Sequence, residues 1–195
     1  MMQGLRVLLG SNSPRRRELL TATGVDFEVR VVPDVDESYP EWMPVREVAE
    51  YLACKKAEAY VQDLGDDELL ITADTVVLLD GKVLGKPEGY EEAVQMLKEL
   101  SGKKHEVLTG VCMTMREKRM SFTEVSSVRF SQLSDREIEF YVERYRPYDK
   151  AGAYGIQEWI GYIGAECVSG SFYNIMGLPT QRVYQELKRF GCFRV

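Results

Sequence analysis

Three arginines stand at the start of a predicted helix, where helix electrostatics disfavours them. Ser13 suits the N-cap and Pro14 the first helical position. Arg15, Arg16 and Arg17 follow directly. The N-terminus of a helix already carries about half a positive charge, so a cation there costs roughly 0.3–1 kcal/mol at an exposed site. Backbone N–H groups and guanidinium forks around one point would bind a phosphate group, and the alternative is a basic surface turn.

The spacing to the next leucines separates the three arginines. Leu19 and Leu20 must supply the apolar face of the helix, and the first two arginines precede them by four residues, about one turn. Arg15 and Arg16 therefore lie on the face that can meet a ligand. Arg17 falls on the other flank, where we expect it to be solvated.

A lysine and an aspartate interrupt apolar surfaces further along the chain. Lys56 lies on the apolar stripe of a helix predicted at 45–62, so its ammonium either needs an anionic partner or extends to the rim of the core. Asp74 lies within an apolar strand predicted at 69–79. A buried carboxylate is costly unless it is paired, bound to a metal or open to a cleft. Asp74 is therefore either half of a structural ion pair, or a general base or metal ligand.

An acidic, proline-punctuated loop at 33–44 contains Asp36 and Glu37. By themselves these residues favour a solvated loop. Together with Asp74 they could hold a hard cation, since Mg²⁺ prefers a few carboxylates plus substrate phosphate. Lys86, in a turn before a proline, could reach a phosphate, although an exposed lysine is the simpler interpretation.

The overall composition argues against several classes of protein. The 195 residues carry a formal net charge of −6, which disfavours a nucleic-acid-binding surface. Four scattered cysteines without a CxxC pair, and His105 as a single, structural histidine, argue against a zinc site and predict reduced thiols in a cytoplasmic protein. Arg6 interrupts the N-terminal apolar stretch, so we expect no secretory signal. No apolar run approaches the roughly 20 residues of a membrane span, so we expect no membrane partner.

Strand and helix patterns alternate along the whole chain. The expected strands lie at 5–10, 27–32, 69–79, 82–84, 105–116, 119–130 and 171–176. The expected helices lie at 14–23, 45–62, 90–101, 134–145 and 179–190. Asp80-Gly81 is a strong hairpin signal, and Ser134 with Glu137 forms a capping box. The alternation predicts an α/β fold with a mixed central β-sheet flanked by helices.

Short motifs follow one another along the chain in a recognisable order. They are Ser11-Asn12-Ser13-Pro14-Arg15-Arg16, Lys56-Ala57, Ala73-Asp74-Thr75-Val76-Val77, Gly85-Lys86-Pro87, Leu100-Ser101-Gly102 with His105 and Thr109-Gly110, Lys150-Ala151-Gly152-Ala153-Tyr154-Gly155-Ile156-Gln157, and Asn174 with Gly177-Leu178-Pro179. In this order they make the chain resemble the Maf-like nucleoside triphosphate pyrophosphatase family over essentially its whole length. The resemblance implies a single domain over residues 1–195, with two lobes around a nucleotide-binding cleft as in Maf and ITPase-like proteins.

The resemblance also implies an activity: hydrolysis of a nucleoside triphosphate to its monophosphate and pyrophosphate with a divalent cation, Mg²⁺ or Mn²⁺. Gly155-Ile156-Gln157 is similar to the branch that acts on dTTP and UTP, and modified pyrimidine nucleotides are further candidate substrates. Asp74 matches the proton acceptor that activates water, and Glu37 and Asp74 match metal ligands. The matching substrate positions are Ser11, Arg15, Arg16, Lys56, Thr75, Lys86 and Gln157, of which Arg15, Thr75 and Gln157 are linked to substrate selection.

Two other functions stay open on the sequence alone. A nucleotide-sensing regulator of cell division or septum formation with little turnover would share the binding residues, but it would not need the intact base and metal carboxylate. RNA binding would require a strong, salt-dependent affinity that the acidic charge does not favour. The expected partner is therefore a small nucleoside triphosphate, and a homodimer is compatible with the family.

Overall fold

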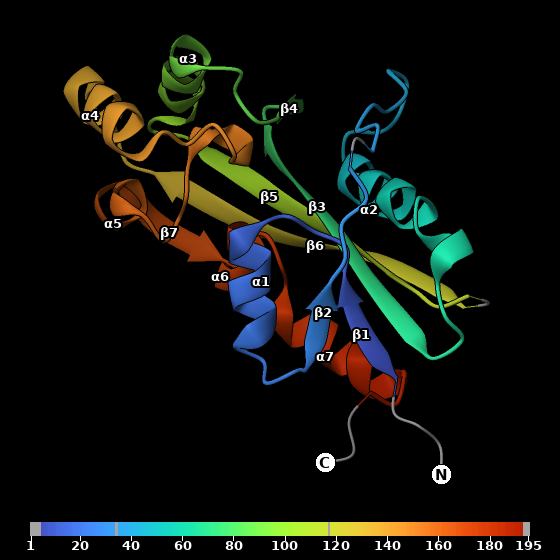
Figure 1. Cartoon of the computed structure of the whole chain (residues 1–195). Coiled ribbons are helices and arrows are strands. Elements are labelled where there is room, and N and C mark those ends of the chain that lie inside the picture. The colour runs from blue at the N-terminus through green and yellow to red at the C-terminus, as the bar shows by residue number, and fades with distance from the viewer. Residues whose placement is uncertain (1–4, 34, 117, 193–195) are drawn as a thin grey trace. The chain divides into compact units, whose positions relative to one another are not determined.

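The computed structural model describes residues 5–33, 35–116 and 118–192 (Figure 1). Its strands are β1 (Arg6–Leu9), β2 (Phe27–Val29), β3 (Glu68–Leu79), β4 (Lys82–Leu84), β5 (Lys104–Thr114), β6 (Arg119–Phe130) and β7 (Ala165–Ser169). Its α-helices are α1 (Pro14–Thr21), α2 (Val48–Glu58), α3 (Tyr90–Leu100), α4 (Asp135–Tyr145), α5 (Trp159–Gly164), α6 (Phe172–Met176) and α7 (Thr180–Arg189). A membrane span would need a longer and more apolar helix than any in these described ranges.

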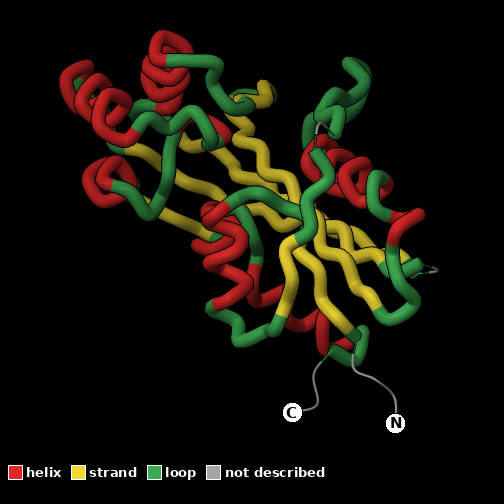
Figure 2. The backbone as a smooth tube through the Cα atoms, viewed as in Figure 1, coloured by secondary structure: helices red, strands yellow, loops and turns green. Residues whose placement is uncertain are grey.

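The strands of the described chain form one mixed sheet, which confirms the predicted fold class. Their order is β2-β1-β3-β5-β6-β7, with β4 paired to β3. β1 runs parallel to both β2 and β3, whereas β4 runs antiparallel to β3 and β7 antiparallel to β6. Figure 2 shows β2, β1 and the first part of β3 side by side.

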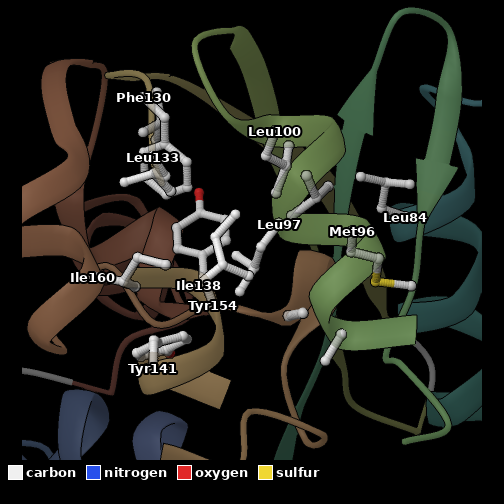
Figure 3. Close-up of a cluster of buried hydrophobic side chains, with 14 of the residues drawn as sticks. Leu84, Met96, Leu97, Leu100, Phe130, Leu133, Ile138, Tyr141, Tyr154 and Ile160 are labelled. Carbon is white, nitrogen blue, oxygen red and sulfur yellow. The ribbon is translucent and has the colours of Figure 1, made fainter. Parts of the chain in front are cut away.

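The chain divides into two compact units, each with a hydrophobic core of its own. Unit 1 contains the chain up to Asp74, Thr109–Glu124 and the chain from Gly177 onward, and unit 2 contains Thr75–Leu108 and Val125–Met176. The core of unit 1 includes Leu8, Ala53, Ala57, Tyr60, Leu64, Leu70 and Cys112. The core of unit 2, drawn in Figure 3, includes Leu84, Met96, Leu97, Leu100, Phe130, Leu133, Ile138, Tyr141, Tyr154 and Ile160.

Helix α2 packs so closely on β5 that only glycine fits at the contact. A Cβ atom built on Gly110 would lie 2.2 Å from the carbonyl oxygen of Ala49, well inside contact distance. The same helix buries Ala53 and Ala57, and Thr72 Oγ1 of β3 donates a hydrogen bond to the Ala53 carbonyl at 2.7 Å. Small side chains therefore hold α2, the helix that carries Lys56, directly against the sheet.

Local signals in the sequence predicted several element boundaries correctly. Ser13 caps α1, where its side chain accepts a hydrogen bond from the Arg16 N–H, and Pro14 is the first helical residue. Ser134 and Glu137 form the capping box of α4. Asp80 and Gly81 have positive φ angles of 51° and 80°, as a tight hairpin turn between β3 and β4 requires.

The strand expected at 171–176 is wrong, because these residues form helix α6. Ser171 Oγ accepts a hydrogen bond from the Asn174 N–H at 3.2 Å, which starts the helical turn. The buried Asn174 amide donates to the Val107 carbonyl at 3.1 Å and to Ser126 Oγ at 2.9 Å. These contacts come from distant segments and override local strand propensity. The strand of this region is β7, which the sequence analysis missed because its residues are exposed or half-buried and show no apolar alternation.

A buried glutamate at the start of β3 predicts the pH dependence of stability. Arg30 donates to both carboxylate oxygens of Glu68 at 2.7 and 2.9 Å, and Arg6 donates to Oε1 at 2.6 Å. Hydrogen bonds from Arg30, together with the Gly65 N–H, lower the pKa of Glu68 to about 2. Because the folded pKa lies below the unfolded value of about 4.3, the contribution is complete above pH 4.3 and is lost as pH falls towards 2.

We therefore expect Glu68→Gln to lower the free energy of unfolding by about 1–3 kcal/mol at pH 7. The arginines are partly exposed, so solvent screening keeps the loss below what a dry ion pair would give. Urea unfolding at a series of pH values measures the difference from the wild-type protein, which should shrink between about pH 5 and pH 2. A difference that stays constant over that range would contradict the assignment.

Candidate active site

A lysine between two carboxylates forms the centre of the candidate site in unit 1. Lys56 Nζ of α2 lies 2.5 Å from Asp74 Oδ1 of β3 and 3.0 Å from Glu37 Oε1 of the acidic loop. The side chains of Lys56 and Asp74 are only 14% and 10% exposed. The lysine on the apolar stripe therefore has anionic partners, and the aspartate within the apolar strand is paired. The contact compensates both buried charges at once.

The neighbouring residues form a second, more exposed ion pair that the sequence analysis did not predict. Lys55 Nζ donates to Asp36 Oδ2 and to the Ser38 carbonyl, both at 2.7 Å. Asp36 also accepts hydrogen bonds from the Ser38 N–H and hydroxyl. The bonds from Lys55 and Ser38 hold the pKa of Asp36 well below its usual range. Asp36 thus pairs with Lys55, and Glu37 pairs with Lys56. These two ion pairs attach the loop to α2, and Glu37 shares the Lys56 ammonium with Asp74.

Side-chain hydroxyls cap the turn between β1 and α1. Ser11 is buried, and its hydroxyl accepts a hydrogen bond from the Ser13 N–H at 3.2 Å. Ser13 in turn accepts from the Arg16 N–H at 3.4 Å. Arg15 and Arg16 are half-buried and Arg17 is exposed, which confirms the predicted difference between their faces.

Arg16 is held by a backbone contact and lies in the electrostatic field of the carboxylates. Its Nε donates to the Gly177 carbonyl at 2.8 Å, which fixes the guanidinium. Burial lowers the pKa of Arg16, while the negative charges of Asp74 and Glu37 oppose that shift. The guanidinium therefore stays charged within the electrostatic range of the lysine–carboxylate cluster.

The other predicted site residues, Thr75, Lys86 and Gln157, belong to unit 2. Thr75 is half-buried in β3, and Lys86 is exposed in the turn after β4. Gln157 is half-buried, and its Oε1 is buried without a hydrogen-bond partner in the described structure. Because leaving a buried acceptor unsatisfied costs free energy, this amide oxygen is suited to accept a hydrogen bond from a ligand.

The loop before Gln157 is held by a buried network in unit 2. The Tyr141 hydroxyl of α4 accepts a hydrogen bond from the Gly155 N–H at 3.0 Å and donates to Glu158 Oε2. Lys150 Nζ lies 3.2 Å from the other oxygen of Glu158. Burial raises the pKa of Tyr141, which keeps its proton available for this bond. The residues on both sides of Gln157 are therefore fixed by side chains from other segments.

His105 supports the same loop from β5, in the structural role predicted for it. Its Nε2 lies 2.7 Å from the Tyr154 hydroxyl, and its ring packs edge-on against Phe130 and Tyr154. Figure 3 shows Tyr154 among the apolar side chains of this core. Burial lowers the pKa of His105 to about 4, so the ring is neutral near pH 7.

Tyr141 and Glu158 were missed as site residues because nothing local marks them. Tyr141 shares an apolar helix face with Ile138 and Val142, which is the pattern of an ordinary core residue. Glu158 directly follows the recognised motif and reads as a surface acid. Only the folded chain brings the hydroxyl of one to the carboxylate of the other.

Comparisons with known proteins identify sequence relatives of this chain and one solved structure that it resembles. A "dTTP/UTP pyrophosphatase" of Bacteroides thetaiotaomicron is 60% identical over 94% of this chain and 95% of its own length. A protein of the same description from Parabacteroides distasonis is 56% identical over 95% of this chain and 96% of its own. Among solved structures, a HAM1 protein from Coxiella burnetii matches 95% of this chain and 99% of its own length with a TM-score of 0.48 and 14% sequence identity.

The family itself is identified by a match along nearly the whole chain. The model of the family described as "Maf-like protein" matches residues 6–190. That range contains the turn into α1, the lysine–carboxylate cluster and the loop that ends at Gln157. The chain therefore belongs to the Maf-like protein family.

Proposed function

We propose that this protein hydrolyses dTTP and UTP to the monophosphate and pyrophosphate, with Asp74 as the general base. The observation that carries the proposal is the buried Asp74 carboxylate in contact with Lys56, beside Glu37 and within the field of Arg16. Relatives that are 52–60% identical over nearly their whole length bear the name of this activity. The cluster supplies the base and the fixed cations that such a hydrolysis needs.

The start of α1 would bind the phosphates. Its first turn supplies the positive end of the helix dipole, and Ser11, Arg15 and Arg16 lie in or just before that turn. Splitting the bond between the α- and β-phosphates develops negative charge on the departing pyrophosphate. Guanidinium and ammonium groups fixed in advance, such as Arg16 and Lys56, stabilise that charge without reorganising. Lys86 would add a further cation from the turn after β4.

Asp74 would accept the proton of the attacking water. As the water oxygen bonds to the α-phosphorus, the bond to the oxygen bridging the α- and β-phosphates breaks and its electrons leave with pyrophosphate. The released proton passes to the Asp74 carboxylate, and Lys56, bound at Oδ1, holds that carboxylate in position. Lys56 thereby acts both on the base and on the phosphate charge.

Glu37 and Asp74 fit a divalent cation such as Mg²⁺ or Mn²⁺. Both supply hard carboxylate oxygens, and both already meet at one cationic group, the Lys56 ammonium. In the described parts of the chain no group of three or more His, Cys, Asp or Glu side chains is arranged to hold a metal ion. Substrate phosphate oxygens would have to complete the coordination, as is usual for Mg²⁺. When bound, the cation neutralises phosphate charge and orients water.

Gln157 would form hydrogen bonds with the edge of the pyrimidine base of the substrate. Thymine and uracil share an N3–H donor flanked by carbonyl oxygens, and a glutamine amide can accept from the first and donate to the second. The buried, unsatisfied Oε1 of Gln157 supports this role. Thr75 and Arg15 would be further determinants of substrate selection.

Asp74→Asn tests the general base. We expect turnover of dTTP and UTP to fall by at least about 10²-fold, because the amide cannot take a proton from water. Monophosphate and pyrophosphate are quantified for both proteins over a panel of standard and modified triphosphates with Mg²⁺ and Mn²⁺. Stoichiometric orthophosphate in place of pyrophosphate would refute the reaction. Tight binding of dTTP by the wild-type protein without turnover would instead favour a nucleotide-sensing regulator.

The adjacent lysines provide a matched pair of variants. Lys56→Met removes the ammonium from Asp74 and Glu37, whereas Lys55→Met removes one from Asp36 and Ser38. We expect kcat/KM for dTTP to fall at least about ten-fold further in Lys56→Met, since only that cation is fixed against the reacting carboxylate. Steady-state kinetics of both variants measures the difference. Equal losses would show that the lysines act only by attaching the loop.

Tyr141→Phe tests whether the loop network positions Gln157. The variant keeps the buried ring but removes the hydroxyl that bonds Gly155 and Glu158. We expect the ratio of kcat/KM for dTTP to that for dATP to fall about ten-fold, because both hydrogen bonds are lost and a buried group left unsatisfied costs about 1–3 kcal/mol. Tyr145→Phe, whose ring stacks on Tyr141 from the same helix, is the control. If Tyr141→Phe lowered kcat/KM equally for dTTP and dATP while the variant remained folded by circular dichroism, the role of the hydroxyl would be structural only.

A further inference from the structure

Two of the four cysteines, Cys54 and Cys112, lie together in unit 1 and are not members of the lysine–carboxylate cluster. Cys54 is half-buried on α2, and Cys112 is fully buried on β5. Cys54 packs against the core cluster that contains Cys112, and Cys112 Sγ also lies 3.3 Å from Thr114 Oγ1. Both are reduced in this structure. They lie 58 residues apart in the sequence (112 − 54), so the folded chain brings them together.

The packing of α2 on β5 explains why these two positions meet. Gly110 touches the α2 backbone at Ala49 and Glu50, and a Cβ atom there would lie within 2.3 Å of the Glu50 nitrogen. Four residues along the helix advance about 6 Å, and two residues along a strand advance about 6.6 Å. Cys54 follows Glu50 by four residues on α2, and Cys112 follows Gly110 by two residues on β5. Because these two distances are nearly equal, Cys54 lies over Cys112 as Glu50 lies over Gly110.

The direction of the helix over the sheet agrees with this register. Glu50 accepts hydrogen bonds from Ser121 and Thr123 of β6, while Glu58 pairs with Arg119. Later residues of α2 thus contact earlier residues of β6. Thr72 Oγ1 also reaches the carbonyl of Ala53 at 2.7 Å and that of Cys112 at 3.5 Å. The backbones beside both cysteines are therefore held against one side chain of β3.

We propose that Cys54 and Cys112 form an oxidisable dithiol that a hydroperoxide converts to a disulfide. The Cys54 thiolate attacks one peroxide oxygen, the O–O bond breaks, and Cys54 becomes a sulfenic acid while hydroxide or an alkoxide leaves. That leaving group takes up the proton that the Cys54 thiol had released and becomes water or an alcohol. The Cys112 sulfur then attacks the Cys54 sulfur, and the S–O bond breaks. Hydroxide leaves with the Cys112 proton as water. The two thiols lose two electrons and the peroxide gains them.

The environments of the two sulfurs assign these roles. Cys54 is the half-buried member that a peroxide can reach. The hydrogen bond from Cys112, with the charge of Arg119, lowers the pKa of Cys54 to about 7, while burial and the charge of Glu50 act in the opposite direction. The hydrogen bond to Cys54 and burial raise the pKa of Cys112. The reactive thiolate is therefore Cys54, and Cys112 is the resolving thiol.

The test uses the full chain carrying Cys167→Ser and Cys192→Ser, which removes the exposed and half-buried cysteines outside the pair. The folded protein is treated with excess hydrogen peroxide, denatured with N-ethylmaleimide and digested for mass spectrometry. We expect loss of both thiols, a cross-linked peptide pair containing Cys54 and Cys112, and recovery of both thiols with dithiothreitol. Recovery of two alkylated cysteines after peroxide, or conversion of Cys54 to sulfinic acid without a cross-link, would overturn the proposal.

Single replacements in that background separate the two roles. In Cys112→Ser, Cys54 should stop at the sulfenic acid and be trapped by dimedone. In Cys54→Ser, the buried Cys112 should remain a thiol after the same treatment. Dimedone labelling of Cys112 in preference to Cys54 would contradict the assignment. Peptide mapping of the oxidised wild-type chain gives the same answer independently of how well either variant folds.

Discussion

A carboxylate inside an apolar strand is the constraint on which the rest of unit 1 depends. Asp74 interrupts a β3 that is buried along almost its whole length, and an isolated charge there would be strongly unfavourable. Lys56 compensates it at 2.5 Å, but only because α2 lies very close to the sheet. Gly110, Ala53 and Ala57 make that approach sterically feasible. The small residues of the helix contact are thus as necessary to the site as its charged residues.

Helix α2 also connects Asp74 to the acidic loop that contains Asp36 and Glu37. Lys56 also binds Glu37, and Lys55 binds Asp36, so the loop is attached to α2 at consecutive positions. This arrangement directs Glu37 towards Asp74 and leaves Asp36 at the surface. A loop without helix or strand therefore obtains a defined position from ion pairs to one helix, and contributes one carboxylate to the candidate metal site.

In unit 2, side chains from several segments hold the loop that precedes Gln157. Tyr141, Lys150 and Glu158 satisfy one another in a buried network around Gly155, and His105 holds Tyr154. These bonds hold the loop, whereas Gln157 Oε1 and His105 Nδ1 are buried without a hydrogen-bond partner in the described structure.

The sequence by itself determined the features whose causes are local. The Ser13-Pro14 helix start, the Asp80-Gly81 turn and the Ser134–Glu137 capping box depend on residues within a few positions of each other, so their chemistry could be read directly. The resemblance to the Maf-like family added the candidate site residues. Periodicity could also show that Lys56 and Asp74 are out of place in apolar surroundings, but not that they are each other's partners.

Only the tertiary structure decided which groups meet. Lys56 and Asp74 lie 18 residues apart, Tyr141 and Glu158 lie 17 apart, and Asn174 reaches Val107 across 67 residues. These pairings follow from how helices and strands pack, which no local pattern encodes. The helix at Phe172–Met176 was mistaken for a strand for the same reason, since long-range hydrogen bonds of Asn174 outweigh local propensity. The neighbouring thiols of Cys54 and Cys112 are a further case, because their contact depends on the register of α2 over β5.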